Sequence, residues 1–314
     1  MPYQFKSADI NMRNISFAGF RLYKGMLQKL GIPRHTGDTM VVPILGIQRS
    51  GTSLMYWVFE RDLGVKVYRE ASELSSEDKV EGIRLNPLPA VAEAIHRHRL
   101  PMVVFKPLVE SQRAHELLAA FPAAKVLWAY RHYQDVAASN INAFGPDNGK
   151  SDLQPLIHDD PHNWRSQNSS AATRETIRRF YAPDMNPYDA AALFWWARMQ
   201  LYFEQELDRH PNVMLSRYED LVTNPAHTMR RTYAFLGRPY PGDHIVKDVN
   251  AQSVGKGRVL KLSPAVDALC GDMLARLDRI NETALPLVAA KTKGGDSSRT
   301  AAVGDGIYAG KPTQ

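Results

Sequence analysis

The chain has 314 residues, of which 44% are hydrophobic; this is enough for one large α/β domain with an ordinary core and excludes global disorder. Its formal net charge is +6, but Lys and Arg are scattered among Asp and Glu, a pattern that argues against a nucleic-acid partner and favours a small polyanion. The single cysteine, Cys270, excludes an intrachain disulfide and a cysteine-rich metal site.

The sequence also predicts how the chain is divided. Residues 1–39 are expected to form an N-terminal extension, residues 40–290 a single domain, and residues 291–314 a flexible tail poor in large apolar side chains. The N-terminus has no apolar stretch of signal-peptide length, and the apolar run over 40–47 is too short to cross a bilayer. We therefore expect a cytoplasmic protein without a membrane span.

Short apolar runs, each followed by a segment of helical periodicity, predict a parallel α/β sheet flanked by helices. The predicted strands are 40–47, 65–68, 102–105, 126–130 and 213–216. The predicted helices are about 52–62, 110–121, 134–142, 187–209 and 225–237. The stretch 145–185 is rich in Asp, Asn, Ser, Pro and His without clear periodicity, so we expect an irregular lid or binding loop there.

The first loop, 46–53, follows a strand and opens a helix, so its backbone N–H groups converge on an anion site. Its spacing matches the P-loop G-x-x-x-x-G-K-[ST], except that Thr52 stands where the lysine belongs. Because that lysine holds the β and γ phosphates of a nucleoside triphosphate, its absence argues against a kinase or NTPase, the alternative function. Arg49 is the basic side chain of the loop. A plain Gly-Thr turn capped by Ser50 or Thr52 is the structural alternative.

A second anion-binding pair follows the strand 126–130. Arg131 stands at the carboxyl end of this strand, where ligands bind in open α/β sheets, and Ser139 lies two helical turns later. Together they can hold one phosphate from two sides. The alternative is an ion pair between Arg131 and Asp135.

The third segment, 215–225, contains the end of a strand and a polar turn. A helix is expected to follow, beginning at Pro225 and ending at Gly237. Glu219 and Asp220 suit paired acid–base work, but adjacent side chains diverge after a strand. We therefore favour a structural role for both.

These three segments, in this order, resemble the family of sulfotransferases that use 3'-phosphoadenosine 5'-phosphosulfate (PAPS), over roughly 41–264. The resemblance implies a three-layer P-loop-like fold, and a sulfotransferase domain over 40–290. It implies a 5'-phosphosulfate loop formed by Arg49, Ser50, Gly51, Thr52 and Ser53. It also implies that Arg131 and Ser139 bind the 3'-phosphate, and that the segment from Arg217 resembles the family's strand-to-helix signature.

Two further contacts are implied by the same resemblance. The segment 253–258 is similar to a basic C-terminal loop of the family, so Lys256, Gly257 and Arg258 are expected to close over the 3'-phosphate. Tyr218 is similar in position to an aromatic residue that contacts the adenosine.

The chain also departs from the cytosolic steroid and phenol members of the family. It has Arg49 where they usually have Lys, and Leu54 where they have an aromatic residue. The segment 105–108, where they carry a catalytic histidine, has none. The chain therefore looks closer to the carbohydrate-type and bacterial branches.

Sulfuryl transfer is an in-line displacement in which charge grows on the bridging oxygen, so positioning and electrostatic stabilisation by Arg49 and the loop N–H groups are expected to suffice without a metal. The acceptor, a hydroxyl or amine of a small molecule or carbohydrate, must lose a proton. Glu70 follows the strand 65–68, whose carboxyl end should face the same cleft, and is our predicted base. The competing candidates are Glu73, His115, His158 and His162.

Overall fold

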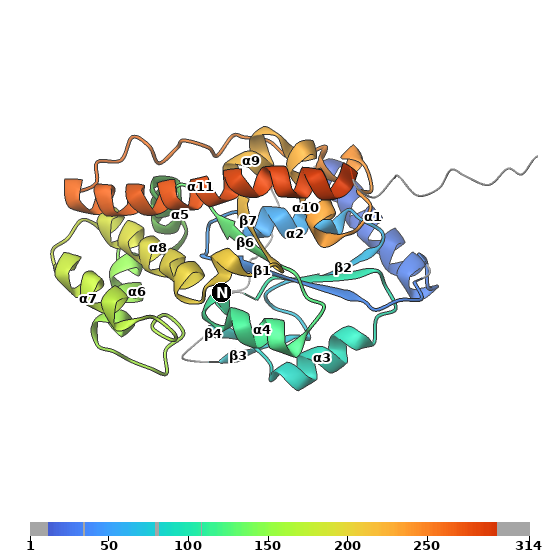
Figure 1. The fold of residues 1–314 in the computed structure, drawn as a ribbon, viewed down its shortest axis with the longest axis horizontal. Helices are drawn as coiled ribbons and strands as arrows, with labels where there is room; N and C mark the ends of the chain where they lie inside the picture. The colour runs from blue at the N-terminus through green and yellow to red at the C-terminus, as the bar shows by residue number, and fades with distance from the viewer. Residues whose placement is uncertain (1–11, 34, 79–81, 108, 294–314) are drawn as a thin grey trace, which may run out of the picture.

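The computed structural model describes residues 12–33, 35–78, 82–107 and 109–293. Its centre is a five-stranded sheet in the order β2–β5–β1–β6–β7 (Figure 1). All four strand pairs are parallel. The strands are β1 (Met40–Gly46), β2 (Val65–Tyr68), β5 (Met102–Phe105), β6 (Val126–Tyr130) and β7 (Val213–Arg217). The predicted parallel α/β fold is confirmed, and each predicted strand agrees within one residue.

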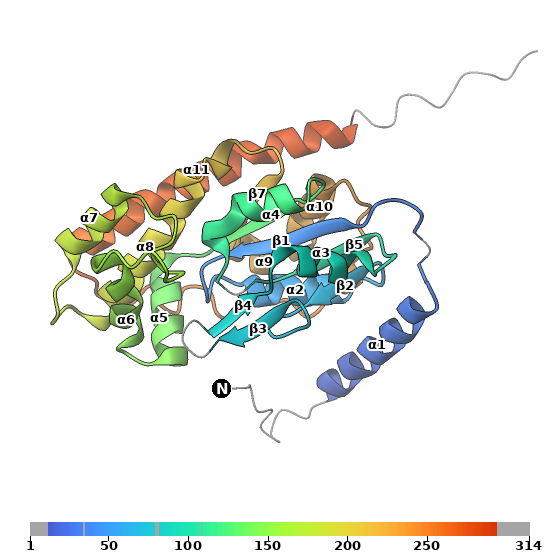
Figure 2. The same ribbon diagram turned by 90° about the horizontal axis from the view of Figure 1, so that it is seen from below.

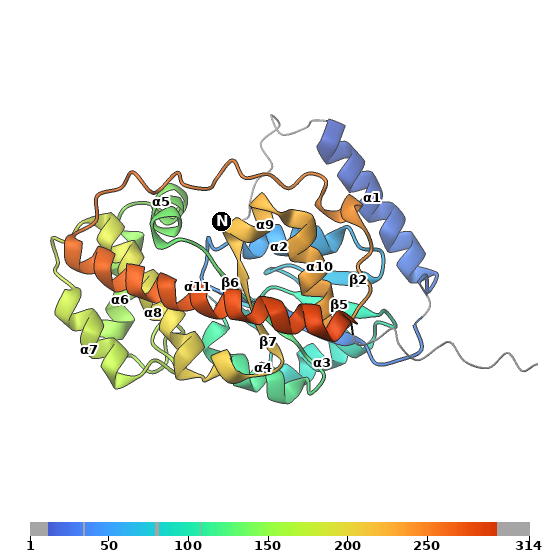
Figure 3. The ribbon, with the colours of Figure 1, turned by 45° about the horizontal axis from the view of Figure 1, so that its top comes forward.

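Helices cover both faces of this sheet, which gives the predicted three layers. One face carries α2 (Thr52–Glu60), α9 (Tyr218–Thr223) and α10 (Pro225–Leu236). The other carries α3 (Leu88–His96), α4 (Ala114–Ala120), α5 (Tyr133–Phe144), α8 (Pro187–Glu204) and α11 (Pro264–Lys293). Because side chains of a strand alternate between faces, Val42 and Val104 pack toward α2, whereas Val41 and Val103 pack on the opposite side. Helix α11 contacts α8, α10 and β7 (Figure 3).

The predicted helices are recovered with small changes at their ends. The helix expected over 110–121 begins with a 3₁₀ turn, η2 (Ser111–Arg113), and the helix expected over 187–209 ends in another, η3 (Leu207–Arg209). Helix α10 ends, as predicted, at Gly237, whose φ of 67° lies in the left-handed region that glycine favours.

Several elements were not predicted from the sequence. They are α1 (Met12–Lys29), β3 (Ser75–Asp78), β4 (Gly82–Leu85), α3, α9 and η4 (Asp243–Val246). The strands β3 and β4 form an antiparallel hairpin outside the main sheet, and the polar sequence of β3 gives no apolar run to mark it. Helix α9 stands where we expected only a polar turn.

The expectation of an irregular segment over 145–185 is wrong. The segment contains α6 (Asn148–Ile157) and α7 (Ala171–Phe180), and both helices pack against α8. Leu153, Leu156, Trp164 and Ile177 are buried in this packing. Both helices are short and mostly polar, and Pro155 lies inside α6, so few apolar side chains mark them in the sequence. The packing is the physical reason that the segment is ordered.

The ends of the chain complete the description. Helix α1 precedes the sheet and lies on the outside of the molecule (Figure 2). Helix α11 extends through the first three residues of the expected tail, and the rest of that tail, 294–314, lies outside the described residues. No helix in the described part is long and apolar enough to cross a membrane. The division into an extension, a domain and a tail remains a prediction.

Candidate active site

The loop between β1 and α2 is held in shape by two glycines and one serine. Gly46 has a φ of 130°, and a Cβ there would lie 2.3 Å from the carbonyl oxygen of Ala129 on β6. Gly51 has a φ of 88°, and a Cβ there would lie 2.2 Å from the ring of Tyr218. The hydroxyl of Ser111 accepts a hydrogen bond from the Gly46 N–H (2.9 Å) and donates to the Gly46 carbonyl (2.7 Å). Only glycine fits both positions.

The N-cap of α2 is Gly51, and no side chain caps the helix. The alternative in which Ser50 or Thr52 caps an ordinary turn is therefore wrong. The Ser50 hydroxyl is instead buried, and it has no hydrogen-bond partner among the described residues. A buried donor without a partner is destabilising, so the loop is better suited to an added acceptor than to the free state.

The first and second sequence motifs meet at Arg49. Its Nε donates a hydrogen bond of 2.9 Å to the hydroxyl of Ser139 on α5, 90 residues away along the chain. Arg49 itself is exposed and has a φ of 69°, a left-handed conformation that non-glycine residues adopt at a free-energy cost. The side chains assigned to the 5' and 3' ends of the donor thus lie in one place.

Arg131 follows β6, as predicted, and is buried under the C-terminal loop. Its Nη2 donates 2.5 Å to the carbonyl of Ser253 and lies 3.7 Å from a carboxylate oxygen of Asp135. Its guanidinium lies 4.4 Å from the ring centre of Tyr218. The alternative pairing with Asp135 is therefore present. Nε of Arg131 remains buried without a hydrogen-bond partner in the described part of the chain.

The C-terminal loop is fixed to α5 through Asp135. The two carboxylate oxygens of this buried residue accept hydrogen bonds from the N–H groups of Gly255 (2.8 Å) and Gly257 (2.7 Å). A Cβ at position 257 would lie 2.1 Å from the carbonyl oxygen of Gln134, so glycine is required. Lys256 and Arg258 are exposed on either side of this contact. The loop thus carries two exposed cationic side chains, and it contacts Arg131 through the carbonyl of Ser253.

The aromatic ring of Tyr218 separates this loop from the first one. It is buried between Gly51 and Arg131, and its hydroxyl shares a hydrogen bond with that of Ser253. The neighbouring carboxylates diverge as predicted. Glu219 accepts from the His132 N–H (3.0 Å), and Asp220 accepts from Asn281 (2.9 Å). Burial raises the pKa of Glu219, but its contacts are structural.

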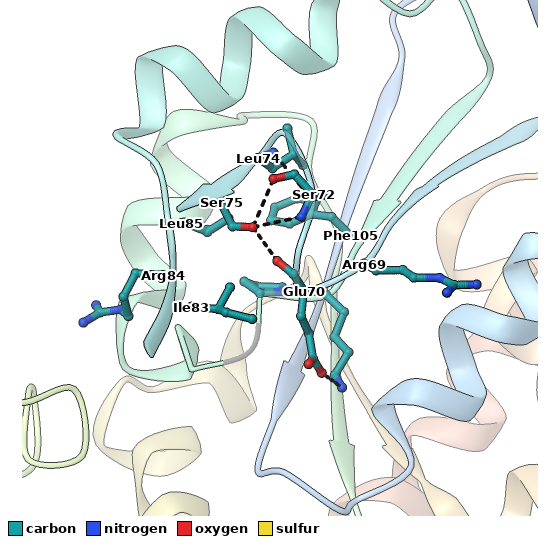
Figure 4. A pocket seen from close by; sticks show the side chains of 11 residues that line it. Arg69, Glu70, Ser72, Leu74, Ser75, Ile83, Arg84, Leu85 and Phe105 are labelled. Carbon is teal, nitrogen blue, oxygen red and sulfur yellow. Dashed lines mark hydrogen bonds and ion pairs between the residues drawn. The ribbon is translucent and has the colours of Figure 1, made fainter. Parts of the chain in front are cut away.

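Glu70, the predicted base, lies at the carboxyl end of β2 beside a lysine that we did not single out from the sequence (Figure 4). Lys106 is 7% exposed, pairs with the Glu70 carboxylate, and donates 3.0 Å to the hydroxyl of Ser53 on α2. The sequence signal for Lys106 was its position directly after the buried strand β5, which neighbours β1 in the sheet. The candidate base is thereby connected to the start of α2, the helix that follows β1.

A small hollow lies between Glu70 and the β3–β4 hairpin (Figure 4). Its volume is about 10 Å³, which is the space of a single water molecule. The hollow is therefore too small for a substrate, whereas 31% of the Glu70 side chain is open to solvent.

Two competing bases are engaged elsewhere. Glu73 accepts a hydrogen bond of 2.7 Å from the hydroxyl of Tyr68, which lowers the pKa of this carboxyl, and Nε2 of His115 bonds the carbonyl of Gln205 at 2.7 Å. His158 and His162 lie at and after the end of α6. Among the described residues, no three His, Cys, Asp or Glu side chains gather so that they could hold a metal ion.

A family model described as "Sulfotransferase domain" matches residues 40–265. The chain belongs to the sulfotransferase family. The kinase or NTPase alternative is set aside with this assignment, and the family expected from the three motifs is confirmed. Such an enzyme transfers a sulfuryl group.

Solved sulfotransferase structures are similar to the chain along most of its length. A sulfotransferase from Alicyclobacillus acidocaldarius is 18% identical, covers 79% of this chain and 97% of its own, with a TM-score of 0.41. The sulfotransferase domain of the Synechococcus PCC 7002 olefin synthase is 15% identical and has a TM-score of 0.44; the match covers 78% of this chain and 97% of that domain. A mouse sulfotransferase complexed with PAP is 13% identical and has a TM-score of 0.42; the match covers 86% of this chain and 92% of the mouse chain. No curated protein sequence matches the chain.

Proposed function

We propose that this sulfotransferase moves a sulfuryl group from PAPS to a hydroxyl or amine of a small-molecule or carbohydrate acceptor. The observation that carries the proposal is the hydrogen bond between Arg49 and Ser139, which joins the anion loop after β1 to the anion-binding pair after β6. A donor with phosphate groups at both its 5' and 3' positions needs two such elements side by side.

The residues present fit this donor. Two buried polar atoms without a partner in the described residues, Ser50 Oγ and Arg131 Nε, lie one at each expected phosphate position. The exposed side chains of Lys256 and Arg258 would add charge at the 3' end, and Tyr218 lies between the two positions. A 3'-phosphate would thus offer an anionic acceptor to Nε of Arg131, beside the backbone carbonyl that its Nη2 now contacts.

The chemistry is a displacement at sulfur. The acceptor oxygen or nitrogen attacks the sulfur atom, the bond from sulfur to the bridging oxygen breaks, and negative charge appears on the leaving bisphosphate. Arg49 and the N–H groups of the loop would stabilise that charge. Glu70 would take the acceptor proton, while Lys106 holds the carboxylate and connects it through Ser53 to the first turn of α2.

Calorimetry with adenosine 3',5'-bisphosphate, compared with ATP plus Mg²⁺, tests the donor. We expect the bisphosphate to bind tightly and ATP to bind weakly. The transfer of labelled sulfate from PAPS to a panel of phenols, alcohols, amines and sugars tests the acceptor class. Preferential binding of ATP, or the absence of labelled product with every acceptor, would contradict the proposal. The cytoplasmic location remains a prediction from the sequence.

A further inference from the structure

The C-terminal part of helix α1 turns polar side chains toward the rest of the protein. Lys24 is buried, and its ammonium donates 2.7 Å to the carbonyl of Glu60 at the end of α2. One turn later, the side-chain amide of Gln28 donates to the carbonyls of Leu63 (2.9 Å) and Val65 (3.0 Å). Polar side chains are therefore the inward contacts along this part of the helix. A helix on a soluble core normally has the opposite polarity.

The outward side of the same helix is apolar. We call Leu22, Tyr23, Met26, Leu30 and Ile32 the α1 patch; their side chains are 78%, 52%, 54%, 68% and 46% exposed. Eight large apolar side chains are exposed in the described part of the chain, and these five make up most of them. Leu22, Met26 and Leu30 recur every four residues and so share one face of the helix and its end. Exposed apolar side chains gathered in this way mark an interaction surface.

The charge of α1 decides what kind of surface fits the patch. The helix carries Lys or Arg at 13, 21, 24 and 29, and no Asp or Glu. Of these, Lys29 is exposed, and Arg21 is 46% exposed although its Nε lies 3.7 Å from a carboxylate oxygen of Glu60, so cations accompany the apolar side chains. An apolar face with Lys and Arg and no acidic residue is typical of helices that lie in the surface of an anionic membrane.

A second copy of the chain fits the patch less well. A two-fold interface would bring the same cations of both copies together, and like charges repel. A stable dimer also buries about 20 to 30 residues a side, whereas the patch has five apolar ones. A membrane surface needs neither a matching partner nor a large area.

We propose that α1 binds the surface of membranes that contain anionic lipids, with the α1 patch buried at the boundary between headgroups and acyl chains. The inward contacts of Lys24 and Gln28 attach the body of the enzyme to the bound helix. Phe17, whose ring lies 4.8 Å from that of Trp57, continues this attachment along α2, the helix that starts at the anion loop. The proposal does not depend on the reaction that the enzyme catalyses.

Sedimentation of the full chain with vesicles tests this. We expect binding to vesicles of phosphatidylcholine mixed with phosphatidylserine, weak binding to phosphatidylcholine alone, and a fall in binding as salt is raised. Replacing Leu22 and Met26 together by Glu should lower the partition coefficient by about tenfold or more, since two apolar anchors are lost and repulsion is added. Because both side chains are exposed, the thermal unfolding temperature should not change.

Phe144→Glu is the matched control, because Phe144 is 49% exposed on α5, outside the patch, and its substitution should leave vesicle binding unchanged. Three results would overturn the proposal. The parent chain stays in the supernatant with both kinds of vesicle; or the double variant binds like the parent; or light scattering shows a dimer of the parent that the double variant abolishes, which would assign the patch to a second copy.

Discussion

The hydroxyl of Ser111 holds both polar groups of the Gly46 backbone, at 2.9 Å from the nitrogen and 2.7 Å from the carbonyl oxygen. Ser111 belongs to the turn that precedes α4, and Gly46 begins the anion loop. The side chain of Gln205, on the C-terminal side of α8, donates 3.0 Å to the carbonyl of Ser111 and so supports this contact. The start of the loop is therefore positioned by residues that are distant in the sequence.

Ser111→Ala should destabilise the protein and weaken nucleotide binding. The substitution leaves the buried N–H of Gly46 without its acceptor, which costs about 1 to 3 kcal/mol. Urea unfolding and calorimetry with adenosine 3',5'-bisphosphate measure the two effects. Ser169→Ala is the control, because the Ser169 hydroxyl is also buried but has no partner among the described residues. Equal effects of the two substitutions would refute the positioning role.

Arg131→Ala should weaken the binding of a 3'-phosphate selectively. The loss of a charge-assisted contact corresponds to about 1.5 to 3 kcal/mol for adenosine 3',5'-bisphosphate. Adenosine 5'-monophosphate, which lacks the 3'-phosphate, should lose much less affinity. Arg131 also packs on Tyr218, so a similar loss for both nucleotides would show that the substitution only disturbs the site.

Arg49→Ala should lower kcat by about a hundredfold to a thousandfold while nucleotide affinity falls much less, because the charge it meets develops in the transition state. Arg49→Lys should recover part of the rate. Single-turnover measurements confirm that chemistry limits the rate. A loss of binding as large as the loss of turnover would make Arg49 a uniform binding contact instead.

Glu70→Gln should lower kcat by about a hundredfold or more, since general base catalysis is lost while the shape of the side chain is kept. Binding of the bisphosphate should remain near that of the parent. Glu73→Gln is the matched control, because Glu73 is the neighbouring carboxylate held by Tyr68. If the two variants have the same turnover, Glu70 is not the base.

The buried Lys24 should make stability depend on pH. Burial lowers the pKa of Lys24 from 10.5 to about 8. Glu60 and Asp62 oppose this shift by smaller amounts, and Lys66 and Arg21 add to it. Between these values the unfolded chain binds more protons, so stability should rise as pH increases from about 8 to 10.5. Below that range the buried charge lowers the free energy of unfolding by up to roughly 3 kcal/mol, relative to an uncharged Lys24.

Lys24→Met should therefore remove this rise, so the stability of the variant relative to the parent should be highest at neutral pH and should fall toward about pH 10. Urea unfolding of both chains across this range measures it. Lys29→Met, at an exposed position of the same helix, should change little at any pH. A stability difference between Lys24→Met and the parent that is constant with pH would contradict the burial of a charged lysine.

The sequence by itself determined the five strands of the main sheet and the residues that stand at their carboxyl ends. The strands Met102–Phe105 and Val126–Tyr130 are short apolar runs, and burial of both faces of a parallel sheet requires such runs. The glycine-containing turn between β1 and α2 was equally readable. Its glycines meet steric demands at fixed spacing, and Arg131 follows its strand directly. These signals are local in the chain.

Only the tertiary structure decided which of these residues meet. Arg49 and Ser139 are 90 positions apart, Gly46 and Ser111 are 65 apart, and Glu70 and Lys106 are 36 apart. Local periodicity carries no information about such contacts, because chain topology brings them together. The same reason explains why α6 and α7 were missed. Their apolar residues are few, and packing against α8 stabilises them.

Helix α1 shows the limit of sequence patterns most directly. Its amphipathic sequence contains both a polar and an apolar face, and the usual rule would place the apolar face on the core. The structure places Lys24 against Glu60 and leaves Leu22 exposed. The backbone carbonyls at the end of α2 and the start of β2 accept the donors of Lys24 and Gln28, and only the folded sheet assembles those acceptors in one place.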